Sequence, residues 1–143
     1  MISQHTHYGM SVTVPLDYDQ AVERTRSALA QEGFGVLTEI DVRATMKKKL
    51  DVDFRPYIIL GACNPALAHR ALSAEPDIGL LLPCNVIVYA SDAPGTSVVA
   101  AMDPVAALEL TQNDAVQPIA LEVRDKLERV LADVEASTHQ THP

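Results

Sequence analysis

The chain has 143 residues, of which 48% are hydrophobic and 21% are charged, a balance typical of one ordinary globular domain. The formal net charge is -8, and a surface this acidic repels nucleic acid and anionic lipid. No apolar run reaches the roughly 18 residues that a membrane-spanning helix requires. We therefore expect neither a nucleic-acid nor a membrane partner.

The beginning of the sequence predicts a cytoplasmic protein. Residues 1–10 lack a basic segment followed by an apolar one, so they do not predict a signal peptide. In the cytoplasm, Cys63 and Cys84 are expected to be thiols rather than a structural disulfide.

The first predicted elements are a strand and a helix. Residues 8–14 alternate between apolar and polar, which predicts a strand. Asp17 and Gln20 have the spacing of a capping box, which begins a helix. Gly33 is a typical residue just beyond a helix C-terminus, so we expect this helix to end there.

A second strand and helix are predicted next. Phe34, Val36, Thr38 and Ile40 alternate at strand spacing. Asp41 is then expected to cap a short helix that continues to Leu50, and residues 51–56 are expected to form a loop.

The middle of the chain predicts a buried strand that leads into a helix. Residues 57–63 are almost entirely apolar and rich in β-branched side chains. Asn64 and Pro65 then have the pattern of an N-cap followed by proline in the first turn. Pro76 prevents this helix from continuing, and residues 77–83 are expected to form a packed loop.

The last part of the chain predicts a hairpin and two helices. Residues 86–89 and 96–102 are expected to be strands joined by a turn at 92–95. A short helix is predicted over 103–110, and apolar residues at helical spacing predict a long one over 114–134.

We expect these elements to form a single domain over residues 8–136, with flexible tails at 1–7 and 137–143. No repeat or linker divides the chain. Five strands interspersed with helices, ending in a long amphipathic helix, are typical of an α+β fold with helices on one face of a sheet. A cavity between such a sheet and its helix is the default ligand site.

The first candidate site is the corner around Cys63. This thiol precedes the predicted N-terminus of a helix, where unpaired amides and the helix dipole favour a thiolate. His69 lies about one and a half turns into that helix. Cys63 and His69 could act as nucleophile and base, or as two ligands of a soft metal. Alternatively, Cys63 is a small buried hydrophobic residue and His69 an exposed polar one.

The second candidate is Cys84, at the start of a predicted strand. The pair Cys84 and Asn85 repeats the pair Cys63 and Asn64, and the two pairs flank the same helix. If the two strands are neighbours, both cysteines approach one cleft. Cys63, His69 and Cys84 would supply three metal ligands, one fewer than a closed structural zinc site needs. Alternatively, Cys84 is buried and Asn85 belongs to a turn.

The third candidate is the lysine run at 47–49. Three positive charges in an acidic chain could hold a phosphate or a carboxylate. Consecutive helical residues diverge by about 100°, so at most one of them, for which we take Lys49, could face a ligand. Alternatively, the run is a solvated helix surface. His5, His7, His139 and His142 are too dispersed to predict a metal site.

The sequence resembles the bacterial and archaeal family called domain of unknown function 302. The resemblance extends from about residue 8 to 134 and is carried by two segments, 57–65 and 78–86, together with the alanine-rich helix between them. It implies a curved, mainly antiparallel sheet with a long C-terminal helix packed across it, similar in outline to TATA-binding-protein-like folds. It also implies a homodimer. No catalytic residue or cofactor is implied.

Three functions therefore compete. The first is a dimeric binding module that holds a small ligand, a soft metal or a haem-like group near Cys63, Asn64, Cys84 and Asn85, with Lys49 as a further contact. The second is thiol redox or nucleophilic chemistry at Cys63, with His69 as its partner. The third is a purely structural or interaction protein. The sequence does not decide whether the protein is an enzyme.

Overall fold

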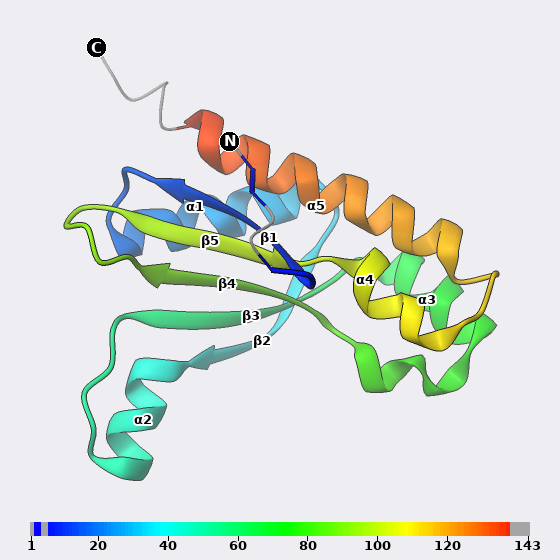
Figure 1. Cartoon of the computed structure of the whole chain (residues 1–143), viewed down its shortest axis with the longest axis horizontal. Coiled ribbons are helices and arrows are strands. Elements are labelled where there is room, and N and C mark those ends of the chain that lie inside the picture. The colour runs from blue at the N-terminus through cyan, green and yellow to red at the C-terminus, as the bar shows by residue number, and fades with distance from the viewer. Residues whose placement is uncertain (1, 4–5, 138–143) are drawn as a thin grey trace.

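The computed structural model describes residues 2–3 and 6–137 and shows one α+β domain (Figure 1). The strands are β1 (Gly9–Val14), β2 (Gly35–Asp41), β3 (Tyr57–Cys63), β4 (Cys84–Ala90) and β5 (Ser97–Met102). The α-helices are α1 (Tyr18–Gln31), α2 (Val42–Leu50), α3 (Pro65–Ala74), α4 (Pro104–Leu108) and α5 (Gln117–Ser137). Two 3-10 helices complete the described elements: η1 (Pro76–Leu81) and η2 (Glu109–Thr111).

The five strands form one antiparallel sheet in the order β1-β5-β4-β3-β2. This order makes β3 and β4 neighbours near the centre of the sheet, with Ala62 opposite Cys84. The predicted antiparallel sheet is therefore confirmed. The strands β1 and β2 are the two edges, and an isolated bridge between Ser3 and Ser11 partly covers the β1 edge.

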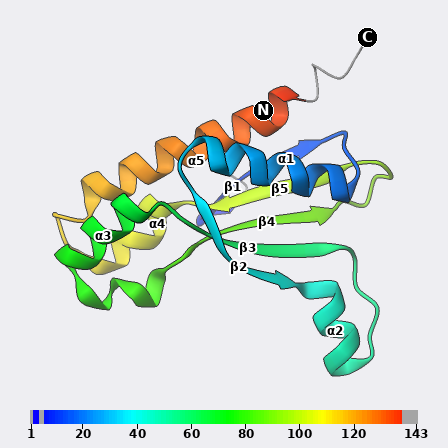
Figure 2. The ribbon, with the colours of Figure 1, turned by 180° about the vertical axis from the view of Figure 1, so that it is seen from behind.

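One face of the sheet is covered by helices, and α1 and α5 lie side by side on it (Figures 1 and 2). Alternate residues of each central strand point into this layer, as the strand period of two requires. Together with residues of α1 and α5, they form an aliphatic core that includes Leu29, Leu60, Val86, Val88, Val99, Leu127 and Leu131. The opposite face of the sheet has no helix over it in the described residues.

Four of the predicted helix starts are confirmed by the caps. The side chains of Asp17, Asp41, Asn64 and Asp103 each accept a hydrogen bond from a backbone N–H in the first turn of the helix that follows. Gly33 has a φ of 82° just beyond α1, a conformation that glycine adopts without steric cost.

Three predicted boundaries were wrong. Residues predicted as a packed loop form η1, because Pro76 at its N-terminus favours a helical turn even though it ends α3. The last helix begins at Gln117, since residues 113–115 form a side-chain-capped turn instead. The strand predicted at 86–89 extends from Cys84 to Ala90, where the sheet neighbours supply partners at both ends.

The helix α2 extends away from the rest of the domain at the β2 edge of the sheet (Figure 1). A register shift between Val36 and Thr38 interrupts β2, and α2 has no buried residue. The predicted alternation corresponds to a buried face only before this shift: Phe34 is buried and Val36 is half-buried, whereas Ile40 is 49% exposed at the edge of the sheet.

The predicted tails lie largely outside the described residues, which omit 1, 4, 5 and 138–143 and therefore also His5, His139 and His142. Within the described part of the chain, no helix is both long enough and apolar enough to cross a membrane.

Candidate functional site

The corner between β3 and α3 is held by Asn64. Its side-chain oxygen accepts a hydrogen bond from the backbone N–H of Leu67 at 3.3 Å, as the N-cap of α3. Its side-chain nitrogen donates to the backbone oxygen of Glu32 at 3.4 Å. Asn64 therefore joins the end of α1 to the start of α3 and fixes the position of the preceding residue, Cys63.

The two cysteines lie at facing ends of neighbouring strands. Cys63 is the last residue of β3 and Cys84 is the first residue of β4. Cys84 is buried on the helix-covered face and Cys63 is half-buried, and both are free thiols. The neighbouring arrangement of the two strands, on which the prediction of a shared cleft depended, is thus present.

Both cysteines line one cavity of about 330 Å3, which we call the cysteine cavity. It lies between α3 and the ends of β2, β3 and β4, with η1, α4 and α5 completing its wall. The wall is almost entirely apolar; besides Cys63, Asn64 and Cys84 it includes Leu37, Leu67, Ala68, Ala71, Leu72, Ile119 and Val123. Leu37 and Leu72 are 68% and 40% exposed, so the cavity has an apolar mouth.

Burial decides the protonation state of Cys84. Removal from water disfavours the thiolate and raises the pKa of Cys84 from 9.0 to about 11, with a smaller contribution from Cys63 nearby. At neutral pH, Cys84 is therefore a protonated thiol that behaves as a small, polarizable apolar group.

His69 does not join the two cysteines. It lies on α3 with an exposed side chain and is not part of the cavity wall. Among the described residues, no three His, Cys, Asp or Glu side chains are arranged to hold a metal ion. The predicted ligand set of Cys63, His69 and Cys84 is thus not assembled, because His69 lies on the solvent side of its helix.

The remaining predicted contacts lie elsewhere. Asn85 follows Cys84 but points to the opposite face of the sheet, since successive strand residues alternate. Lys49 is exposed on α2, which lies away from α3 in Figure 1. Neither residue lines the cysteine cavity. Spacing along the chain could not reveal this separation, because it depends on strand pairing.

The sequence did not predict a close contact that lies beside the cavity. A Cβ atom at Gly61 would lie 2.1 Å from Thr38 Oγ1 and 2.9 Å from Pro83 Cγ. Gly61 therefore lets β2 and the segment before β4 approach β3 on this side. A glycine inside an apolar strand is the one sequence signal that indicates such an approach.

The uncovered face of the sheet contains a second hollow that sequence reasoning missed. This sheet-face cavity encloses about 610 Å3. Its wall includes Tyr57 and Tyr89, whose rings stack with centroids 5.3 Å apart, and Phe54, whose ring lies 6.2 Å from that of Tyr57. These aromatic residues come from a loop and two strands, so only the fold brings them together.

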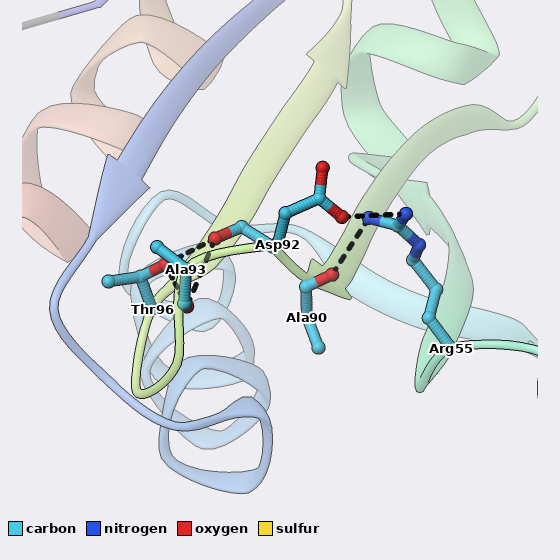
Figure 3. A network of polar contacts seen from close by, with 6 residues as sticks. Arg55, Ala90, Asp92, Ala93 and Thr96 are labelled. Carbon is cyan, nitrogen blue, oxygen red and sulfur yellow. Dashed lines mark hydrogen bonds and ion pairs between the residues drawn. The ribbon is translucent and has the colours of Figure 1, made fainter.

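Arg55 borders the sheet-face cavity and is held by the β4–β5 hairpin. Its guanidinium donates to the backbone oxygen of Ala90 at 3.2 Å and to the carboxylate of Asp92 at 3.0 Å (Figure 3). The guanidinium carbon also lies 5.8 Å from the centre of the Tyr89 ring, within the range of a cation–π contact.

Known proteins share this architecture. A family model described as domain of unknown function DUF302 matches residues 10–134. The chain belongs to the DUF302 family. It is similar to the solved structure of an uncharacterized conserved DUF302 protein from Bacillus stearothermophilus, with 30% sequence identity and a TM-score of 0.82. That match covers 90% of this chain and 99% of the other. No curated protein matches the chain.

The family and the solved structure confirm the predicted resemblance and its fold. Neither description names an activity. The cavities of this DUF302 domain are therefore the features that bear on its function.

Proposed function

We propose that this DUF302 domain is a binding module that holds a small, neutral, apolar molecule in the cysteine cavity. The observation that supports this function is the near absence of polar atoms in the cavity wall. A charged or strongly polar ligand entering such a site would lose its hydration without gaining hydrogen bonds, which is costly.

Two polar groups that border the cavity, those of Asn64 and Cys84, are poor partners for a polar ligand. The side chain of Asn64 is already bonded to Leu67 and Glu32. Cys84 is a protonated thiol, and thiols are weak donors and acceptors. An apolar ligand instead gains by removing its own surface and that of Leu37 and Leu72 from water.

The size of the cavity limits the ligand. Its volume of about 330 Å3 lies at the lower end of the range for small-molecule sites, which is roughly 300–1,000 Å3. We therefore propose a ligand of one or two rings or a short alkyl chain, rather than a haem-sized group.

The proposed thiol chemistry at Cys63 receives less support from the geometry. Cys63 is half-buried at the helix corner, but His69 does not line the cavity and cannot act there as a base. The raised pKa of Cys84 also makes it a slow attacking group, because the thiolate is the nucleophile.

The binding function is tested with 6-propionyl-2-(dimethylamino)naphthalene, a neutral dye with two fused rings whose emission shifts to shorter wavelength in an apolar environment. Ala68 lies on α3, is half-buried and lines the cavity. We expect the purified protein to bind the dye and Ala68→Leu to weaken binding at least tenfold, because the larger side chain occupies the cavity.

Ala66→Leu is the matched control, since Ala66 is on the same helix but is exposed and outside the cavity wall. It should bind the dye as the wild type does. Unchanged binding by Ala68→Leu, with circular dichroism showing a folded protein, would contradict the proposal.

A further inference from the structure

The uncovered face of the sheet has a composition that is unusual for a solvated surface. Antiparallel sheets with one free face usually place polar residues there. Here, the face contributes Ile87, Val98 and Ala100 to the sheet-face cavity, each of them half-buried. The floor of the cavity is therefore an apolar surface across β4 and β5, against which the face of an apolar ring system can pack.

Three tyrosines converge at this cavity. Tyr8, Tyr57 and Tyr89 all line it, and the rings of Tyr57 and Tyr89 stack with centroids 5.3 Å apart. Burial, and then the neighbouring Tyr89 and Tyr8, raises the pKa of Tyr57. Each phenol has an apolar ring and a hydroxyl that can donate or accept a hydrogen bond. The tyrosine hydroxyls therefore offer polar contacts around the apolar floor of the cavity.

The charge of the cavity is opposite to that of the chain. The chain has 19 acidic residues and a net charge of -8, yet the described residues that line this cavity include one basic residue, Arg55, and no Asp or Glu. The ion pair of Arg55 with Asp92 is exposed, with Asp92 93% accessible, so it holds the guanidinium only weakly. A ligand carboxylate can therefore compete for Arg55.

The far end of the floor carries a second polar group. Asn85 lines the cavity, and its amide has no hydrogen-bond partner among the described residues. Asn85 and Tyr89 are four positions apart on β4, a distance of about 13 Å along a strand. Tyr89 lies beneath Arg55, so the positive charge and the amide are at opposite ends of the apolar floor.

We infer that the sheet-face cavity binds a small organic monoanion with a flat apolar body, its carboxylate at Arg55 and a second polar group at Asn85. This site lies on the opposite face of the sheet from the cysteine cavity and takes a ligand of different charge. It therefore goes beyond the proposed function.

The inference is tested by calorimetric titration with 6-hydroxy-2-naphthoate, which has a carboxylate and a hydroxyl at opposite ends of a flat ring system. Its neutral counterpart is 6-(hydroxymethyl)-2-naphthol. We expect the anion to bind at least tenfold more tightly than the neutral compound, because hydrogen bonds to charged groups are the stronger ones. Arg55→Gln should remove most of this difference.

Matched variants locate the binding. Arg24→Gln removes the same charge from α1 and should leave both affinities unchanged. Asn85→Ala should lower the affinity for 6-hydroxy-2-naphthoate to that for 2-naphthoate. Ala100→Phe, which fills the floor, should abolish binding of the anion, whereas Ala68→Leu in the cysteine cavity should not. This last comparison separates the inference from the proposed function.

Three results would overturn the inference. The first is equal affinity for the anion and the neutral compound. The second is an Arg55→Gln variant that binds the anion as the wild type does. The third is a wild-type protein that does not bind the anion and whose dimer becomes a monomer when Ala100 is replaced by Phe. That result would assign this face to a second copy of the chain.

Discussion

At the scale of single residues, the two cysteines differ more than their shared Cys-Asn pattern indicated. Cys84 is buried in the core layer and Cys63 is half-buried at the end of its strand. Both contact the same cavity, but burial raises the pKa of Cys84 to about 11. The sequence predicted that both thiols lie at the ends of elements. Their different burial depends on how each one is placed in the folded sheet.

The difference predicts how Cys84 responds to pH. A thiol whose pKa is two units above 9.0 has about a hundredth of the ordinary thiolate fraction at pH 8. We therefore expect iodoacetamide to modify Cys84 about 100 times more slowly in the native protein than in urea. Peptide mapping by mass spectrometry between pH 7 and 10 measures both rates, with Cys63→Ser as the control that leaves Cys84 alone.

The same pKa shift has a consequence for stability with a definite sign. The folded state holds the Cys84 proton more tightly than the unfolded state does. The contribution of this thiol to the free energy of unfolding is therefore complete below about pH 9 and is lost as the pH rises toward 11. Rapid modification of Cys84 in the native protein at pH 8 would show that this thiol is not buried as described.

At the scale of elements, α3 is positioned by one side chain that serves two helices. Asn64 caps α3 through Leu67 and also donates to Glu32 at the end of α1. The cap was recognisable from the sequence because an N-cap and its proline are local signals. The bond to Glu32 was not, since 32 residues separate the two partners in the chain.

Replacing this side chain should separate its two roles. We expect Asn64→Ala to lower the free energy of unfolding by about 1–2 kcal/mol, the usual cost of losing an N-cap. Asn64→Ser keeps an uncharged acceptor for Leu67 and its shorter side chain loses the bond to Glu32, so its loss should be smaller. Urea denaturation measures both. Equal losses for the two variants would show that the cap contributes little.

At the scale of the whole molecule, charge is distributed unevenly. The helix α2 contains Arg43 and Lys47–Lys49, four of the 11 basic residues, and none of the acidic ones. It has no buried residue and extends from the β2 edge of the sheet (Figure 2). We propose that the chain forms a homodimer and that α2 and β2 are its contact surface, with the acidic surface of a second copy as the complement.

Sedimentation velocity tests this surface. We expect a dimer at low ionic strength that weakens as salt is added, because exposed charges are screened. Lys48→Glu with Lys49→Glu should favour the monomer, since neither lysine is in a described ion pair. Arg24→Glu with Lys126→Glu reverses as many charges elsewhere and should leave the dimer intact. A wild-type monomer at every concentration and salt level would contradict the proposal.

The sequence by itself determined the elements of this protein and most of their ends. Caps, proline positions and apolar periodicity are local, and they predicted five strands, the principal helices and an α+β domain, with small errors at η1, β4 and α5. The family resemblance was carried by residues close together in the chain, and it too could be read directly.

Only the tertiary structure decided which residues meet. Strand order made Cys63 and Cys84 neighbours, and strand alternation sent Asn85 to the other face. The exposed side of α3 kept His69 out of the cavity, and loop and hairpin together placed Arg55 over Tyr89. Cavities are formed by side chains from distant segments, so their shape, charge and burial depend on pairing and packing that no local pattern specifies.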